Sequence, residues 1–120
     1  LKQHKNEQAI LWLEKATSAN PQSLYGLYWL GRAHVQNNNI QQGIQYFLKV
    51  LTQKPDLPQV HHDLGKAYFM NRDYKKALEH VQYALNRNSS MIPYYITLSQ
   101  IYDHMQLEKN ALVFFFFLSR

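Results

Sequence analysis

The stretch LGKAYFMNRDYKKALEHVQYA, residues 64–84, decides the fold. Its opening pair, a Leu followed by a small residue, occurs at residues 30–31, 64–65 and 98–99, so both intervals are 34 residues. Twelve residues after each pair comes another small residue, and four further on comes a bulky apolar residue. A fixed period over most of a chain indicates a repeat architecture. The two later series are Gly43, Ala77 and Ala111, then Phe47, Val81 and Phe115.

Each repeat predicts two helices, because its apolar residues recur three and four positions apart. Turn-forming and capping residues interrupt this spacing at residues 37–39, 54–55, 71–73 and 86–90. Pro58 and Pro93 fall in predicted first turns, where a missing N–H removes no helical hydrogen bond. We predict seven helices, at about residues 5–18, 24–36, 40–53, 58–70, 74–87, 92–105 and 108–119.

The pattern resembles the tetratricopeptide repeat, in which Leu-Gly is followed by Tyr, Ala, a bulky apolar residue, a second Ala and Pro. Residues 64–84 match it most closely, whereas His34 replaces the Tyr in one repeat and Ser99 replaces the Gly in another. The resemblance implies an all-α fold, a right-handed α-solenoid of antiparallel helix pairs. It implies a single array over residues 1–120. The array would begin with the second helix of a half repeat at 1–23, continue with complete repeats at 24–57 and 58–91, and end with a repeat at 92–120 that is truncated at its C-terminal end.

Composition supports one helical domain and excludes several classes of site. The 120 residues are 46% hydrophobic, enough for a core, and 4 Gly and 4 Pro are few for an all-β fold with many turns. Without cysteine there is no disulfide, thiolate nucleophile or Cys-ligated metal. The longest apolar run, residues 111–118, is too short to span a membrane. Localisation stays unknown, with a soluble, cytoplasmic chain as the default expectation.

The resemblance also implies a function. The first helices of such repeats form a concave face that the family commonly uses to hold a peptide or a partner helix. We therefore predict a protein–protein interaction scaffold or adaptor. Flat aromatic side chains beside long cations suit a protein or peptide partner with acidic or carboxylate groups, as does the net charge of +5. The predicted partner-binding residues on this face are Tyr25, Tyr28, Arg32, Gln59, His62, Lys66, Phe69, Ile96, Gln100 and Asp103.

Three alternatives stay open. The ten predicted partner-binding residues are also compatible with an ordinary solvent-exposed face that binds no partner. A helical-repeat surface could instead bind RNA, although nucleic-acid grooves usually align more cations with stacking aromatics. The array could also self-associate through its Phe-rich C-terminal helix, where Phe114, Phe116 and Phe117 form the candidate packing or oligomer surface. That apolar end, together with an unpartnered first helix, predicts a fragment of a larger protein with further repeats or a partner at the C-terminal end.

The histidines do not form a catalytic or metal-binding pattern. The chain contains six His, but none is followed by a second His four residues on, and none lies three residues after a Glu. His34 and His61 occupy positions where the repeat expects aromatic residues, which predicts packing roles. No Gly-rich phosphate loop and no triad pattern occur. We expect no enzyme activity, no cofactor and no metal.

Overall fold

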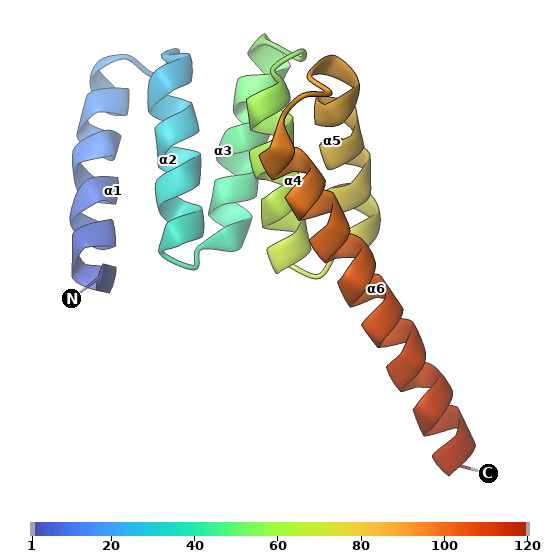
Figure 1. Ribbon diagram of the computed structural model, residues 1–120. Helices are drawn as coiled ribbons and strands as arrows, with labels where there is room; N and C mark the ends of the chain where they lie inside the picture. The colour runs from blue at the N-terminus through green and yellow to red at the C-terminus, as the bar shows by residue number, and fades with distance from the viewer. Residues whose placement is uncertain (1, 120) are drawn as a thin grey trace.

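The computed structural model describes residues 2–119, which form six α-helices joined by short turns. Successive helices lie side by side and run in alternating directions (Figure 1). No strand occurs among the described residues, so the fold is an all-α helical-repeat solenoid. The helices are α1 (Lys2–Ala19), α2 (Leu24–Gln36), α3 (Ile40–Gln53), α4 (Pro58–Met70), α5 (Tyr74–Arg87) and α6 (Ile92–Leu118).

Polar residues cap helices at the predicted breaks. The Ser23 hydroxyl accepts a hydrogen bond from the Gly26 amide at 3.3 Å, and the Asp73 carboxylate accepts one from the Lys76 amide at 3.3 Å. These side chains satisfy amides of the first turn that have no partner within the helix. Pro58 lies in the first turn of α4, as predicted.

The turns between α2 and α3 and between α4 and α5 repeat the same backbone geometry. Asn38 has φ 65° and Arg72 has φ 63°, both in the left-handed region. The two residues are 34 positions apart, so the turn recurs with the sequence period. Asn tolerates this conformation well, whereas it costs most other residues roughly 1–2 kcal/mol.

Glycine allows the two helices of a repeat to approach closely. A Cβ placed on Gly31 would lie 2.7 Å from the Phe47 ring, and one on Gly65 would lie 2.6 Å from Val81 Cγ2. Both distances are shorter than van der Waals contact, so neither position has room for a side chain. The small residue of the repeat pattern is therefore required by packing of α2 on α3 and of α4 on α5.

The main core runs through α2 to α6, and its members are the apolar residues of the repeat pattern. Leu64, Ala77 and Val81 are completely buried at its centre. A smaller cluster of Ile10, Leu30 and Ala33 joins α1 to α2. The periodic positions read from the sequence thus pack in the first two complete repeats, whereas Ser99, Ala111 and Phe115, their equivalents in the third, are exposed.

Residues 92–118 form one helix of 27 residues, so the prediction of separate helices at 92–105 and 108–119 is wrong. In the two preceding repeats the equivalent break contains the left-handed Asn38 or Arg72, followed by the N-cap residue of the next helix. Gln106 and Leu107 occupy the corresponding positions here. Gln and Leu favour helix, and Leu cannot cap one. The helix therefore continues, and its second half projects beyond the rest of the array (Figure 1).

Glu108 links the middle of α6 to the turn between α4 and α5. Glu108 Oε1 lies 3.4 Å from Arg72 Nη2 and accepts a hydrogen bond from the Tyr74 hydroxyl at 3.2 Å. All residues from 102 to 119 are nevertheless exposed. Tyr102 and His104 also reach other helices, through a 3.3 Å hydrogen bond from Gln82 and a ring contact with Phe69. The middle of α6 is therefore held by contacts at its surface, and residues 109–118 do not pack into the core.

Candidate functional site

Helices α2 and α4 line two hollows that adjoin each other. The first, which we call the tyrosine hollow, has a volume of about 340 Å³, and the second, the basic hollow, has a volume of about 440 Å³. The tyrosine hollow is lined by Leu24, Tyr25, Tyr28, Val50, Lys54, Leu57, Pro58, Gln59 and Val60. The basic hollow is lined by Arg32, Val35, Gln36, Phe47, Asp63, Lys66 and Met70. Five of the ten predicted partner-binding residues, Tyr25, Tyr28, Arg32, Gln59 and Lys66, therefore lie in these hollows.

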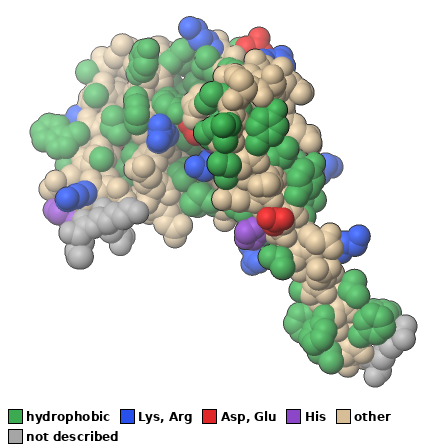
Figure 2. Space-filling view, in the orientation of Figure 1, with side chains coloured by type: hydrophobic (Ala, Val, Ile, Leu, Met, Phe, Trp, Pro, Cys, Tyr) green, Lys and Arg blue, Asp and Glu red, His purple; other side chains and the backbone are tan. Residues whose placement is uncertain are grey.

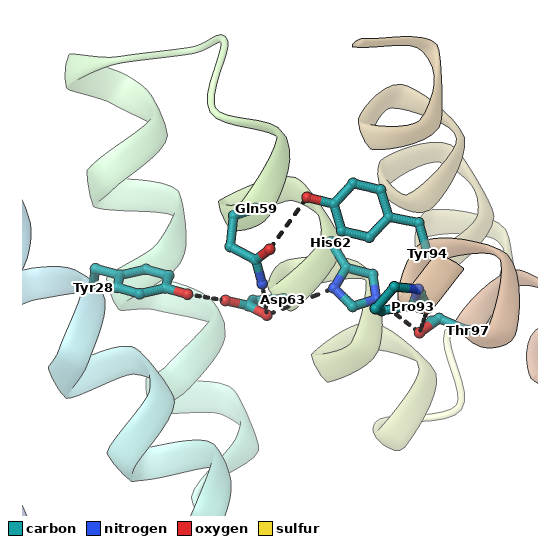
Figure 3. A network of polar contacts seen from close by, with 7 residues as sticks. All are labelled: Tyr28, Gln59, His62, Asp63, Pro93, Tyr94 and Thr97. Atoms are coloured by element: carbon teal, nitrogen blue, oxygen red, sulfur yellow. Dashed lines mark hydrogen bonds and ion pairs between the residues drawn. The ribbon is translucent and has the colours of Figure 1, made fainter. Parts of the chain in front are cut away.

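A hydrogen bond between α2 and α4 separates the two hollows. The Tyr28 hydroxyl of the tyrosine hollow donates to Asp63 Oδ2, which belongs to the basic hollow (Figure 3). Gln59 Nε2 donates to the other oxygen, Asp63 Oδ1, at 3.1 Å, and the Tyr94 hydroxyl of α6 donates to Gln59 Oε1 at 3.2 Å. The network thus connects α2, α4 and α6 and holds Tyr28 and Gln59 in fixed orientations.

Burial shifts the pKa values in this network. Burial raises the pKa of Tyr28 to about 12, and the hydrogen bond to Asp63 adds to the effect. Burial also raises the pKa of Asp63, while its bond from Tyr28 and the nearby Arg32 charge oppose that shift. Tyr28 therefore stays protonated at neutral pH and keeps its role as the donor.

The basic hollow has two cations on different helices. The Arg32 guanidinium lies 5.0 Å from the centre of the Trp29 ring and 5.8 Å from that of Tyr28, in cation–π distance of both. These rings limit the rotamers that Arg32 can adopt. Lys66 of α4 is exposed and forms no ion pair within 4 Å in the part of the chain that the structure describes. The hollow therefore presents one oriented and one exposed cation, together with the Asp63 carboxylate, beside the apolar side chains of Val35 and Met70.

His62 was predicted as a partner-binding residue, but its side chain does not line either hollow. Its side chain is only 5% exposed, because α6 covers it with the Tyr94 ring and with Thr97. The Thr97 hydroxyl donates to the Pro93 carbonyl at 3.1 Å, so we assign the 2.7 Å contact between His62 Nε2 and Thr97 Oγ1 to an Nε2–H donor. Burial, with the Lys66 charge as the lesser cause, lowers the pKa of His62 to about 4. The ring is therefore neutral at pH 7 and serves packing.

The other predicted residues lie outside the two hollows. Phe69 is half-buried, with its ring 4.9 Å from that of His104 and 5.8 Å from that of Tyr74. Ile96, Gln100 and Asp103 are exposed on α6. Phe114, Phe116 and Phe117 are also exposed, on the projecting end of α6, where Figure 2 shows a cluster of hydrophobic side chains.

Sequence reasoning missed Asp63 as the residue that joins the network. The missed signal is a spacing of 35 residues, one more than the repeat. It relates Tyr28 to Asp63, Gln59 to Tyr94, and His62 to Thr97, and each pair is joined by a hydrogen bond between successive first helices. A search for polar pairs at the repeat length plus one would have found these contacts.

Two histidines pack as predicted. His34 is buried and stacks on Tyr46 with ring centres 5.4 Å apart. His61 is buried with its Nδ1 3.0 Å from His80 Nδ1 and its Nε2 2.7 Å from the Pro55 carbonyl. Over the described residues, no group of three or more His, Cys, Asp or Glu is placed to hold a metal ion. No helix among those residues is long and apolar enough to cross a membrane.

Two family models match consecutive parts of the chain. Both describe the tetratricopeptide repeat, one over residues 1–58 and the other over residues 58–90. The chain belongs to the tetratricopeptide repeat family. Tetratricopeptide arrays serve in general as scaffolds for protein–protein interaction, so the chain carries a module of that kind. None of the curated proteins matches the chain.

Solved structures of MamA share the fold. A crystal structure of MamA matches with a TM-score of 0.77 and 24% identity, over 84% of this chain and 59% of that one. MamA 41-end from Desulfovibrio magneticus RS-1 matches with a TM-score of 0.81 and 19% identity, over 93% of this chain and 63% of that one. The chain thus spans about three fifths of the length of these structures. At this level of identity the likeness concerns the fold alone.

Proposed function

We propose that this tetratricopeptide array holds an extended peptide or a partner helix across the tyrosine and basic hollows, and that the ligand presents acidic or carboxylate groups. The observation that carries the proposal is the pairing of Arg32 and Lys66, from successive first helices, around one hollow. The Asp63 carboxylate in the same hollow already accepts hydrogen bonds from Tyr28 and Gln59. A ligand carboxylate between Arg32 and Lys66 would bond to both helices. The adjoining tyrosine hollow would take an apolar or aromatic side chain of the same ligand.

The arrangement favours binding because much of it is oriented before the ligand arrives. Tyr28 and Gln59 are fixed by Asp63, and Arg32 lies against two aromatic rings. Fewer side chains therefore lose rotamer freedom on binding, which lowers the entropic cost of association. Arg also suits carboxylate recognition, since its planar fork can donate two parallel hydrogen bonds.

No catalytic role is part of the proposal. Members of the family act in general by binding, and the polar network between α2 and α4 is used to hold Tyr28 and Gln59 in place. The proposed module is therefore a scaffold or adaptor. Its partner is defined here by chemistry, an acidic protein segment.

An array of short synthetic peptides of graded acidity tests this function. The natural chain should retain peptides rich in Asp and Glu, and Arg32→Glu with Lys66→Glu should weaken their binding by about tenfold or more per lost charge pair. Lys5→Glu with Lys75→Glu makes the same change of net charge on α1 and α5, outside both hollows, and is the matched control. Circular dichroism must show equal helix content. Equal weakening by both double variants would refute the proposed site.

RNA binding gives a different result. Fluorescent single-stranded RNA should bind the chain weakly, and its affinity should fall steeply with salt, as expected for contacts with phosphate alone. Binding of RNA that is tighter than that of every acidic peptide, and is lost in the Arg32→Glu, Lys66→Glu variant, would replace the proposed function with nucleic-acid recognition.

A further inference from the structure

The outward face of α6 carries exposed apolar side chains near both ends of the helix. Its inward face contains Tyr94, Thr97 and Ile101, which are buried against the rest of the array. The outward face points away from them and is uncovered. Its exposed apolar residues include Ile92, Tyr95, Ile96, Val113 and Phe114, which are about half to two thirds exposed.

Helical geometry places these residues on one stripe. Positions seven apart lie nearly in line on an α-helix, so Ile92, Ser99, Gln106 and Val113 share a line. Ile96 and Phe114 are separated by 18 residues, which is five helical turns, and so lie on the same flank. The stripe runs the length of the 27-residue helix, roughly 40 Å, with apolar ends and a polar middle.

We infer that two copies of this chain pair through this stripe, with their α6 helices side by side and antiparallel. Residue 105 is the midpoint of α6 and also the midpoint between Ile96 and Phe114. An antiparallel pair centred there places Ile96 of each copy opposite Phe114 of the other. The same register makes the two helices overlap along their whole length. Self-complementarity of this kind is what a two-fold interface requires.

The antiparallel direction follows from charge. A parallel pair would place Asp103 of both copies at the same level and would align the two helix macrodipoles. The antiparallel pair opposes the macrodipoles and brings Lys109 of one copy level with residue 101 of the other, one residue from Tyr102, where a cation–π contact can form.

The stripe is large enough for a stable dimer. The exposed apolar parts of Ile92, Tyr95, Ile96, Val113 and Phe114, with Tyr102, amount to roughly 600–700 Å² per copy. Pairing would bury roughly 1,300 Å² in total, which falls within the range of specific protein interfaces, about 1,200–2,000 Å². The projecting half of α6 would then be covered without a change in the rest of the fold.

Residues 108–118 of the same chain are the competing occupant of α6. In the repeat register Ala111 and Phe115 correspond to the buried Ala77 and Val81, so this segment could fold back as the second helix of a third repeat. Folding back requires a turn at residues 105–107, where the sequence favours helix. It also requires a close helix approach at Ser99, and at the equivalent Gly65 a Cβ would lie only 2.6 Å from Val81 Cγ2. Both features favour the straight, paired helix.

Two neighbouring residues separate the two arrangements. Phe114 is 61% exposed and Phe115 is 66% exposed, but only Phe114 lies on the outward stripe. Sedimentation velocity over a range of concentrations should show a dimer for the natural chain and for Phe115→Glu. Phe114→Glu should weaken dimerisation by about a hundredfold or more, because it places one carboxylate on each apolar end. A natural chain that stays monomeric at all concentrations, or equal effects of the two variants, would overturn the inference.

Disulfide trapping tests the register, since the natural chain has no cysteine. Gln106→Cys lies within one residue of the midpoint and should oxidise rapidly to a covalent dimer. Ser99→Cys lies on the same stripe, but in the antiparallel pair the two copies of residue 99 are roughly 18 Å apart along the helix axis, too far for a disulfide. Covalent dimer from Gln106→Cys at least tenfold faster than from Ser99→Cys supports the register. Equal rates, or faster trapping at residue 99, contradict it.

Discussion

Acidification should destabilise this fold through His62. Burial lowers the pKa of its ring from the usual 6.5 to about 4, so the folded chain prefers the neutral form. The unfolded chain binds the proton more readily, and this contribution to stability is therefore complete above pH 6.5 and is lost as the pH falls from 6.5 towards 4. The difference corresponds to roughly 3 kcal/mol in full, of which about 2 kcal/mol is already lost at pH 5.

Urea unfolding, followed by far-UV circular dichroism and tryptophan fluorescence, measures this loss. The free energy of unfolding is compared at about pH 5 and pH 7.5 for the natural chain and for His62→Gln, which keeps a polar group beside Thr97 but cannot titrate. The decrease between the two pH values should be about 2 kcal/mol smaller in the variant. Burial also lowers the pKa values of His34 and His80, but both residues are present in both proteins, so their effects cancel. The same pH dependence in both proteins would refute the assignment to His62.

Three other substitutions test the packing and the network. Tyr28→Phe removes a donor from the partly buried Asp63 carboxylate and should lower the free energy of unfolding by about 1–3 kcal/mol in urea titrations. Tyr95→Phe removes an exposed hydrogen bond and should lower it by less than about 1 kcal/mol. Gly65→Ala should lower the melting temperature in calorimetry, because the new Cβ meets Val81 and the Ala77 carbonyl and lowers the free energy of unfolding by about 1–3 kcal/mol. In the control Gly26→Ala the new Cβ meets the Thr17 side chain, which can move, so the loss of stability should be smaller. Replacing residues 105–107 by Asn-Arg-Asp, the sequence of residues 71–73, should break α6 into two helices and abolish the dimer in sedimentation velocity; an unchanged dimer would count against the explanation of the continuous helix.

The spacing of apolar and turn residues predicted the bounds of helices α2 to α5 correctly. The helices at 24–36, 40–53, 58–70 and 74–87 have the bounds expected from apolar spacing and turn residues, because in these segments local preference and packing agree. The break at 105–107 was expected only because the 34-residue period was carried into a third repeat. Its residues, Met, Gln and Leu, favour helix, and a residue-by-residue reading of the turn would have shown the difference.

The candidate site was predictable only in part, since it depends on contacts between repeats. Spacing along α2 and α4 places Tyr25, Tyr28, Arg32, Gln59 and Lys66 on one side, and these residues line the hollows. The burial of His62 depends on how α6 packs on α4, which no periodicity within a helix reveals. Asp63 likewise gains its importance from a residue 35 positions away.

Nitrogen-15 NMR titration tests the central claim most directly. An acidic peptide selected on the array is added to the labelled chain, and the shift changes of the amides are mapped on the structure. Binding in the two hollows predicts changes concentrated in α2 and α4, around Tyr25 to Arg32 and Gln59 to Lys66, and their loss in Arg32→Glu with Lys66→Glu. Changes concentrated on the outer helices α3 and α5, or an undiminished response of the double variant, would contradict the claim.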